Sequence, residues 1–82
     1  MGWLLAITVR MAGNTGLTKA IEVVKQAAAF DSDGNYPEAI KLYLQGLEWF
    51  NHALKYEKDE RTQKTIKLKM TQYMDRVELL RA

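Results

Sequence analysis

The sequence predicts an all-α protein, an antiparallel three-helix bundle over residues 15–82. Three observations predict this fold class: apolar residues recur at helical spacing in three segments, helix-breaking residues separate the segments, and the middle segment is apolar on two sides. A helix with one buried face carries an apolar stripe only about 100° wide. The wider coverage of the middle segment therefore implies that it lies between two other helices.

The first helix is expected over about residues 16–32, after a break at residues 13–16. Asn14 or Thr15 can accept hydrogen bonds from the free amides of its first turn. Its small alanines permit a neighbouring helix to approach closely. The predicted inward positions are Leu17, Ile21, Val24 and Ala28, and the stripe is widened by Ala20, Val23, Ala27 and Phe30.

The second helix is expected over residues 36–57. Gly34 and Asn35 tolerate the left-handed conformation that ends the preceding helix, and Asn35 can also cap the next one. Pro37 falls in the first turn, where its missing amide proton costs nothing. One predicted apolar stripe consists of Ala39, Tyr43, Gly46, Phe50 and Ala53, with Leu42, Trp49 and Tyr56 beside it, and the other consists of Ile40, Leu44, Leu47 and Leu54.

The third helix is expected over residues 60–81, with Asp59 as its cap and Thr62 three positions later. A short connection makes it antiparallel to the second helix. Met74 sits about 100° off the inward seam, so it is either a core residue or a surface contact. The seam consists of Ile66, Met70, Tyr73, Val77 and Leu80.

Length and charge exclude several classes of protein. The 82 residues form one domain, with residues 1–14 as an irregular extension, and no cysteine is present for disulfides or thiolate metal sites. The apolar run at residues 3–9 is far shorter than the roughly 20 residues of a membrane span. A net charge of +2 is too small to indicate nucleic-acid binding. The basic run of residues 55–69 is interpreted as a solvated helix face, or as a site for an acidic partner or anionic membrane surface.

No motif indicates catalysis or a cofactor. His52 is the only histidine, and helical spacing places no serine or aspartate to work with it. A phosphate-binding glycine loop is absent from the sequence. Residues 31–35 briefly resemble a calcium loop, but the glycine comes at the fourth position rather than the sixth. We therefore expect a non-catalytic domain without cofactor or metal.

The hairpin around residues 34–43 is also typical of a tetratricopeptide repeat. Such repeats bury their faces by stacking, and at least three are normally needed. No second copy follows at an offset of about 34 residues. The closed bundle is therefore favoured, and a tetratricopeptide-like scaffold fragment remains the alternative.

Residues 17–81 resemble the microtubule-interacting-and-transport (MIT) domain, especially that at the front of the vacuolar-sorting AAA ATPases that disassemble ESCRT-III polymers. Five segments carry the resemblance by their order and spacing. They are residues 17–21 (LTKAI), residues 34–43 (GNY, EA and LY), residues 48–50 (EWF), residues 52–57 (HALKYE) and residues 72–78 (QYMDR and E).

The resemblance implies a module that captures C-terminal peptide motifs of ESCRT-III subunits in two grooves. In the groove between helices two and three, a position matching Met74 packs against ligand leucines, carboxylates matching Asp75 and Glu78 meet basic residues, and a lysine matching Lys69 meets acidic ones. Val24 matches a contact in the groove between helices one and three. The full set implied for the first groove is Lys69, Met70, Thr71, Met74, Asp75, Glu78 and Trp49.

The function expected from this resemblance is recruitment of a separate AAA ATPase domain to ESCRT-III for endosomal sorting and membrane scission. The domain itself is then a cytoplasmic monomer without nucleic-acid binding or membrane insertion, peripherally recruited to endosomes, in an oligomeric parent protein. The alternatives are the scaffold fragment, the MIT domain of another trafficking or microtubule-associated protein, and a basic adaptor for membranes or microtubules.

Overall fold

The computed structural model describes residues 15–82. The expected extension, residues 1–14, and the possible cap Asn14 lie outside the described residues. Three helices follow one another: α2 (Thr15–Ser32), α3 (Tyr36–Tyr56) and α4 (Glu60–Arg81). Their bounds differ from the predicted ones by one residue at most, and the all-α three-helix bundle is confirmed.

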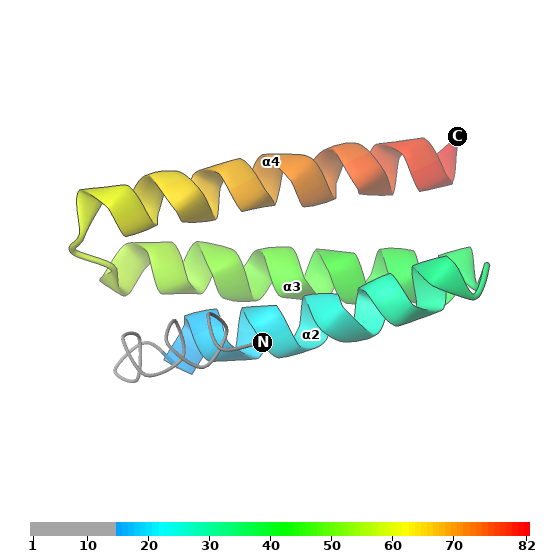
Figure 1. Ribbon diagram of the computed structural model, residues 1–82, viewed down its shortest axis with the longest axis horizontal. Coiled ribbons are helices and arrows are strands. Elements are labelled where there is room, and N and C mark those ends of the chain that lie inside the picture. The colour runs from blue at the N-terminus through cyan, green and yellow to red at the C-terminus, as the bar shows by residue number, and fades with distance from the viewer. Residues whose placement is uncertain (1–14) are drawn as a thin grey trace.

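The middle helix, α3, lies between α2 and α4, and its direction is opposite to both (Figure 1). Its predicted first stripe is buried in full, because α2 and α4 both pack on α3. Contacts between α2 and α4 are sparse by comparison. The structure therefore has two main helix interfaces that share one helix.

The turn between α2 and α3 has the predicted left-handed helix end but not the predicted side-chain cap. Gly34 has φ 79°, and the amides of Gly34 and Asn35 donate to the carbonyls of Asp31 (3.1 Å) and Phe30 (2.9 Å). This pair of bonds is the Schellman arrangement that satisfies the last carbonyls of a helix. The predicted side-chain cap by Asn35 is wrong. Asn35 occupies the cap position, but only its backbone carbonyl accepts a bond, from Ala39 at 3.1 Å.

The cap predicted for α4 is confirmed. An oxygen of the Asp59 carboxylate accepts hydrogen bonds from the amide of Thr62 at 3.1 Å and from its hydroxyl at 2.7 Å. Acceptance of an otherwise unpaired amide by a carboxylate stabilises the first turn of the helix. These bonds also hold the pKa of Asp59 below its ordinary value.

Small residues dominate the interface between α2 and α3. A Cβ atom at Gly46 would lie 2.5 Å from Cγ1 of Val24, so a larger residue at this position requires the Val24 side chain or the helices to shift. The prediction that Ala28 points inward is wrong, because it is exposed and Ala27 is buried in its place. The buried hydrophobic core consists of Leu17, Ala20, Val24, Ala27, Ala39, Tyr43, Phe50, Ala53, Ile66 and Val77.

Aromatic rings fill the interface between α3 and α4. Tyr73 of α4 stacks on Tyr43 and on Phe50, with ring centroids 5.6 Å and 5.8 Å apart. Ile66 and Val77 are buried on the same seam of α4, and the other predicted seam residues are partly buried. The predicted seam is therefore confirmed.

Candidate functional site

Met74 lies on the surface. Its side chain is 51% exposed, whereas Met70, one helical turn earlier, is partly buried against the core. Residues four apart lie on the same face of a helix. The two methionines therefore form an apolar strip that runs from the core edge of α4 out to solvent.

The α3 side of this strip is also apolar. Tyr73 lies between Tyr43 and Phe50, which places Met74 at the level of residues 44–47 of α3. Leu44 is 37% exposed there, and Ile40 and Leu47 are partly buried. We call the set of Ile40, Leu44, Leu47, Met70 and Met74 the α3/α4 surface.

The α3/α4 surface faces away from α2. Gly46 contacts α2, and Leu44 lies about 160° around α3 from Gly46 at 100° per residue. Arg76 of α4 reaches α2, and Met74 lies about 160° around α4 from Arg76. Both helices therefore turn this apolar surface toward solvent on the side of the bundle that α2 leaves uncovered.

Carboxylates border the surface at one end. Glu78 is exposed one turn after Met74 on the same flank of α4, and Asp75 is exposed about 100° around the helix from Met74. Thr71 is exposed as well, and its hydroxyl donates to the carbonyl of Lys67 at 3.1 Å. Of the expected set, Met70, Thr71, Met74, Asp75 and Glu78 thus occupy the α3/α4 surface or its outer margin.

Lys69 and Trp49 lie elsewhere. Lys69 is about 140° around α4 from Met74 and shares the flank of Arg76, which faces α2. Trp49 is about 140° around α3 from Leu44, and its ring meets His52 edge-on with centroids 6.1 Å apart. The structure does not bring these two side chains together with Met74.

Val24 is a core residue in this structure. Only 6% of it is exposed, and it packs against Gly46. Its expected role in a groove between α2 and α4 stays a prediction. Ligand contact by so buried a side chain would require movement of α2.

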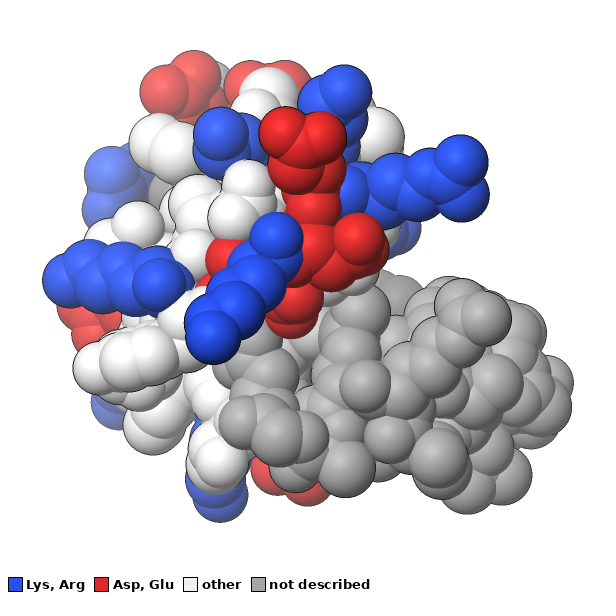
Figure 2. Space-filling model, turned by 90° about the vertical axis from the view of Figure 1, so that its left-hand side faces the viewer, with Lys and Arg blue, Asp and Glu red and all other residues white. Residues whose placement is uncertain are grey.

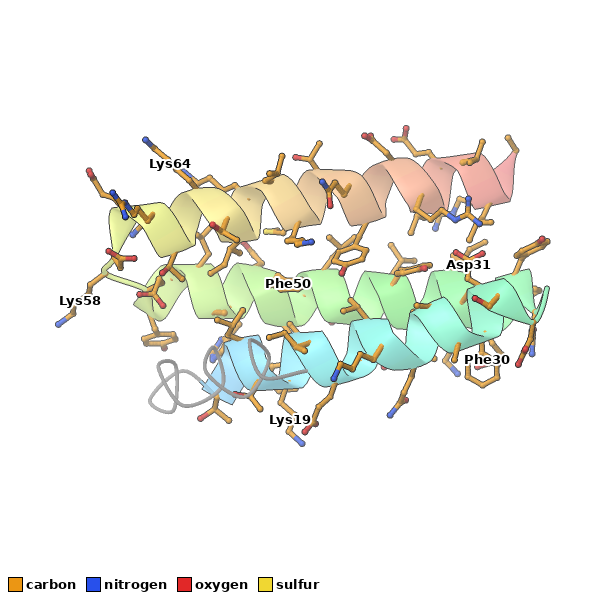
Figure 3. All side chains as sticks on the ribbon, in the orientation of Figure 1. Lys19, Phe30, Asp31, Phe50, Lys58 and Lys64 are labelled. Carbon is orange, nitrogen blue, oxygen red and sulfur yellow. The ribbon has the colours of Figure 1, made fainter. Side chains whose placement is uncertain are left out.

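A polar cluster that the sequence analysis missed joins all three helices. The Asp31 carboxylate of α2 accepts hydrogen bonds from the Tyr43 hydroxyl of α3 (2.9 Å) and from Nε (2.7 Å) and a terminal nitrogen (2.6 Å) of Arg76 on α4. Figure 3 shows Asp31 near the end of α2. We call these three residues the Asp31 clasp. No sequence motif marks it, since its ion pair spans 45 positions.

The clasp shifts the titration of its members. Hydrogen bonds from Arg76 hold the pKa of Asp31 below its ordinary value, because they favour the charged carboxylate. Burial, and then the hydrogen bond to Asp31, raise the pKa of Tyr43 to about 12. The Asp31 side chain is only 12% exposed, so the pair with Arg76 is partly shielded from water.

The basic residues at the α3–α4 turn extend into solvent. Lys58 and Lys64 point away from the helices (Figure 3). Acidic side chains stand among the basic ones at this end of the molecule (Figure 2). Mixed charge of this kind is typical of a solvated surface rather than a nucleic-acid footprint.

The described part of the chain contains neither a candidate metal site nor a candidate membrane span. Residues 15–82 contain no group of three or more His, Cys, Asp or Glu side chains placed to hold a metal ion. None of the helices in the same range combines the length and apolar character that crossing a bilayer requires. His52 is exposed, and its ring lies 5.0 Å from that of Tyr56.

Comparisons with known proteins agree with this architecture. Vacuolar protein sorting-associated protein 4 of Dictyostelium discoideum is 54% identical over 79% of the chain. Protein SUPPRESSOR OF K(+) TRANSPORT GROWTH DEFECT 1 of Arabidopsis thaliana is 47% identical over 78%. Human serine/threonine-protein kinase ULK3 is 38% identical over 88%. The matched region covers 15% of each relative's length.

A family model matches residues 17–82, which include all but the first two described residues. Its description is the MIT (microtubule interacting and transport) domain. The tetratricopeptide alternative is set aside, because the match is to a different helical family. The chain therefore belongs to the MIT domain family.

Proposed function

We propose that this domain binds C-terminal peptide motifs of ESCRT-III subunits on its α3/α4 surface. The exposed apolar side chain of Met74 is the observation that carries the proposal. An amphipathic helix laid along α3 and α4 would cover Met74 and Leu44 with its leucines. This is the helix-in-groove mode of peptide recognition.

The two methionines suit such a ligand. Methionine is unbranched and polarizable, so it adapts to several patterns of ligand leucines. Met70 is already held against the core, and Met74 projects beyond it. The helices need not separate to admit a peptide, because the apolar atoms already face solvent.

Charges at the margin set a direction for the ligand. Glu78 and Asp75 lie toward the C-terminal end of α4, and Lys67 and Lys64 lie toward its N-terminal half. A peptide with basic residues near Glu78 and acidic residues near Lys67 gains favourable electrostatic contacts. These pairs are exposed, so they contribute more to orientation than to affinity.

Binding by one such helix is expected to be weak. A single short helix buries less area than a standard protein interface, so a dissociation constant on the order of micromolar, about −8 kcal/mol, is expected. An ESCRT-III polymer presents many copies of the motif. An oligomeric parent protein can engage several at once, which raises the effective affinity.

The parent protein that best fits is an AAA ATPase that acts on ESCRT-III at endosomal membranes. The chain is 54% and 47% identical to the Dictyostelium and Arabidopsis relatives but only 38% identical to the human kinase. These identities favour an ATPase parent over a kinase parent. The domain then serves as the recruiting module, and the ATPase domain remodels the polymer. The coding sequence after Ala82 distinguishes the two, since a nucleotide-binding ATPase domain supports the proposal and a kinase context contradicts it.

Substitution of Met74 tests the binding surface. Met74→Asp places a charge where ligand leucines must pack, and should lower the affinity for an ESCRT-III C-terminal peptide at least tenfold. Leu79→Asp is the matched control, because Leu79 is 63% exposed and lies about 140° around α4 from Met74. Titration calorimetry measures both variants, and circular dichroism checks that each remains helical. Equal affinities of Met74→Asp and wild type would contradict the proposal.

A further inference from the structure

Methionine supplies all the sulfur in this chain. The sequence has four methionines and no cysteine, so no thiol competes with the thioethers for an oxidant. Two of the methionines, Met70 and Met74, lie within the described residues, and both belong to α4. The reaction of this chain's sulfur with a peroxide therefore depends on how accessible each methionine is.

The two methionines of α4 differ in exposure although they are one helical turn apart. Met74 is 51% exposed, whereas Met70 packs against the hydrophobic core and is only partly exposed. A peroxide must reach the sulfur atom to transfer oxygen to it, so an exposed thioether reacts faster than a covered one. Met74 is therefore the more reactive of the two.

Oxidation of Met74 changes the chemistry of the α3/α4 surface. A sulfoxide is polar and accepts hydrogen bonds, whereas the thioether that it replaces is apolar. Ligand leucines offer no hydrogen-bond donor. The hydroxyl of Thr71, three residues before Met74, already donates to the carbonyl of Lys67 at 3.1 Å. A ligand that covers the sulfoxide therefore removes its oxygen from water without supplying a hydrogen bond, which costs binding free energy.

We propose that Met74 is a reversible oxidation site whose sulfoxide weakens ligand binding at the α3/α4 surface. The oxidant is a peroxide. A lone pair of the Met74 sulfur takes one oxygen atom from hydrogen peroxide as the O–O bond breaks, and water is released. Reversal takes a dithiol, which is oxidised to a disulfide while the sulfoxide oxygen leaves as water. The effect on binding rests on the proposed function, whereas the site of oxidation does not.

The position of Met74 lets the oxidation act on binding without unfolding the domain. A sulfoxide within a hydrophobic core is destabilising, because its oxygen loses water there. At Met74 the oxygen stays in water as long as no ligand is bound, and the methionine that packs on the core is the covered one, Met70. Oxidation of Met74 should therefore lower affinity and leave helix content unchanged.

Peptide mapping tests the site of oxidation with no ligand present. The full chain is treated with dilute hydrogen peroxide for increasing times and is then digested with trypsin. Cleavage after Lys69 and Arg76 releases residues 70–76, so fragment ions compare both methionines within one peptide. Oxygen should appear on Met74 several-fold faster than on Met70, and the two rates should become equal in urea. Equal rates in the folded chain, or faster reaction of Met70, would overturn the proposal.

Calorimetric titration with an ESCRT-III C-terminal peptide tests the effect on binding. The affinity of the oxidised chain should be about tenfold lower than before treatment, since an unpaired polar group in an apolar contact costs free energy of this order. Methionine sulfoxide reductases with a dithiol should restore the affinity. Circular dichroism should stay constant throughout. Unchanged affinity once Met74 carries oxygen would overturn the proposal.

Two leucine variants assign the effect to one sulfur atom. In Met74→Leu, peroxide should leave the affinity at its value before treatment, although the other three methionines remain. In Met70→Leu, peroxide should still lower the affinity as in wild type. The reverse pattern would overturn the proposal. If the untreated chain does not bind the peptide, the proposed function fails and the effect on binding fails with it, whereas the mapping alone decides whether Met74 is the oxidation site.

Discussion

The two interfaces of α3 differ in the size of the side chains that fill them. On the α2 side, Ala39, Gly46 and Ala53 are buried, Gly46 lies against Val24, and Ala53 lies against Gly16. On the α4 side, stacked rings fill the interface, and the apolar residues beside them remain partly exposed. Small residues give close packing with little apolar surface left over. Large side chains leave apolar residues partly exposed at the edge of the interface, where a ligand can cover them.

The substitution with the largest expected effect on stability enlarges Gly46. Gly46→Leu should lower the free energy of unfolding by about 3 kcal/mol, because its side chain meets Val24 with no free space. Small domains have only several kcal/mol of stability in total, so the variant should be largely unfolded on mild warming. Urea denaturation followed by circular dichroism measures the loss.

The adjacent position is the control for this variant. Gln45→Leu adds the same side chain at an exposed position of α3 and should change stability little. If Gly46→Leu and Gln45→Leu had the same urea midpoint, the close packing of α2 on α3 would be refuted.

The next effect concerns the Asp31 clasp, which joins α2 to α4 across α3. Asp31→Ala removes the shared acceptor of Tyr43 and Arg76 and should cost about 2 kcal/mol, in the range for hydrogen bonds to a charged group. Asp33→Ala, at an exposed carboxylate two residues away, is the control. A loss no greater than that of the control would show that the clasp contributes nothing to stability.

The clasp also predicts how stability depends on pH. The pKa of Asp31 is lowered in the folded state, so its contribution is present above its ordinary pKa of 3.8 and is lost as pH falls through the folded value. Wild type should therefore lose more stability than Asp31→Asn below about pH 4. Urea midpoints at several acidic pH values measure the difference, and parallel curves for the two proteins would contradict the assignment.

At alkaline pH the dependence of stability on pH has the opposite sign. The pKa of Tyr43 is raised from 10.0 to about 12, so its contribution is present below pH 10.0 and is lost as pH rises toward about 12. Tyr43→Phe removes this titration and should flatten the curve in that window. A steeper fall in the Tyr43→Phe variant would argue against burial as the cause of the shift.

The smallest expected effect compares the two helix starts. Asp59→Ala removes two hydrogen bonds to Thr62, whereas Asn35→Ala removes no side-chain cap. Only the first substitution should lower the thermal midpoint measurably. Similar losses in both variants would contradict the difference between the caps.

The helices themselves could be predicted because local chemistry determines where they begin and end. Gly34 supplies the left-handed residue, Pro37 fits a first turn and Asp59 caps α4. These signals need no knowledge of how the helices pack. The first stripe of α3 is buried as its spacing predicted. The prediction for the second stripe is only partly right, because Leu44 is exposed and Ile40, Leu47 and Leu54 are partly buried at the edge of the α3/α4 interface.

The candidate site was predictable only in part, because its composition depends on how each helix is rotated. Met74 could be assigned to the margin of α4 from its offset, but the offset did not show whether α3 would cover it. Trp49 and Lys69 lie about 140° around their helices from Leu44 and Met74, and this offset follows from helical spacing alone. Spacing did not show which of the two flanks of α4 faces α2, which the contact of Arg76 with Asp31 shows. The clasp between Asp31 and Arg76 likewise depends on the register of helices distant in sequence.

We expect the ligand to bind the partly exposed α3/α4 surface rather than the closely packed α2/α3 interface. Titration of an ESCRT-III C-terminal peptide into isotope-labelled protein, followed by NMR, tests it most directly. We expect the largest shifts at Leu44, Met70 and Met74, with Ala20 and Gly46 little changed. Shifts centred on Ala20 and Gly46, with Met74 unaffected, would contradict the account.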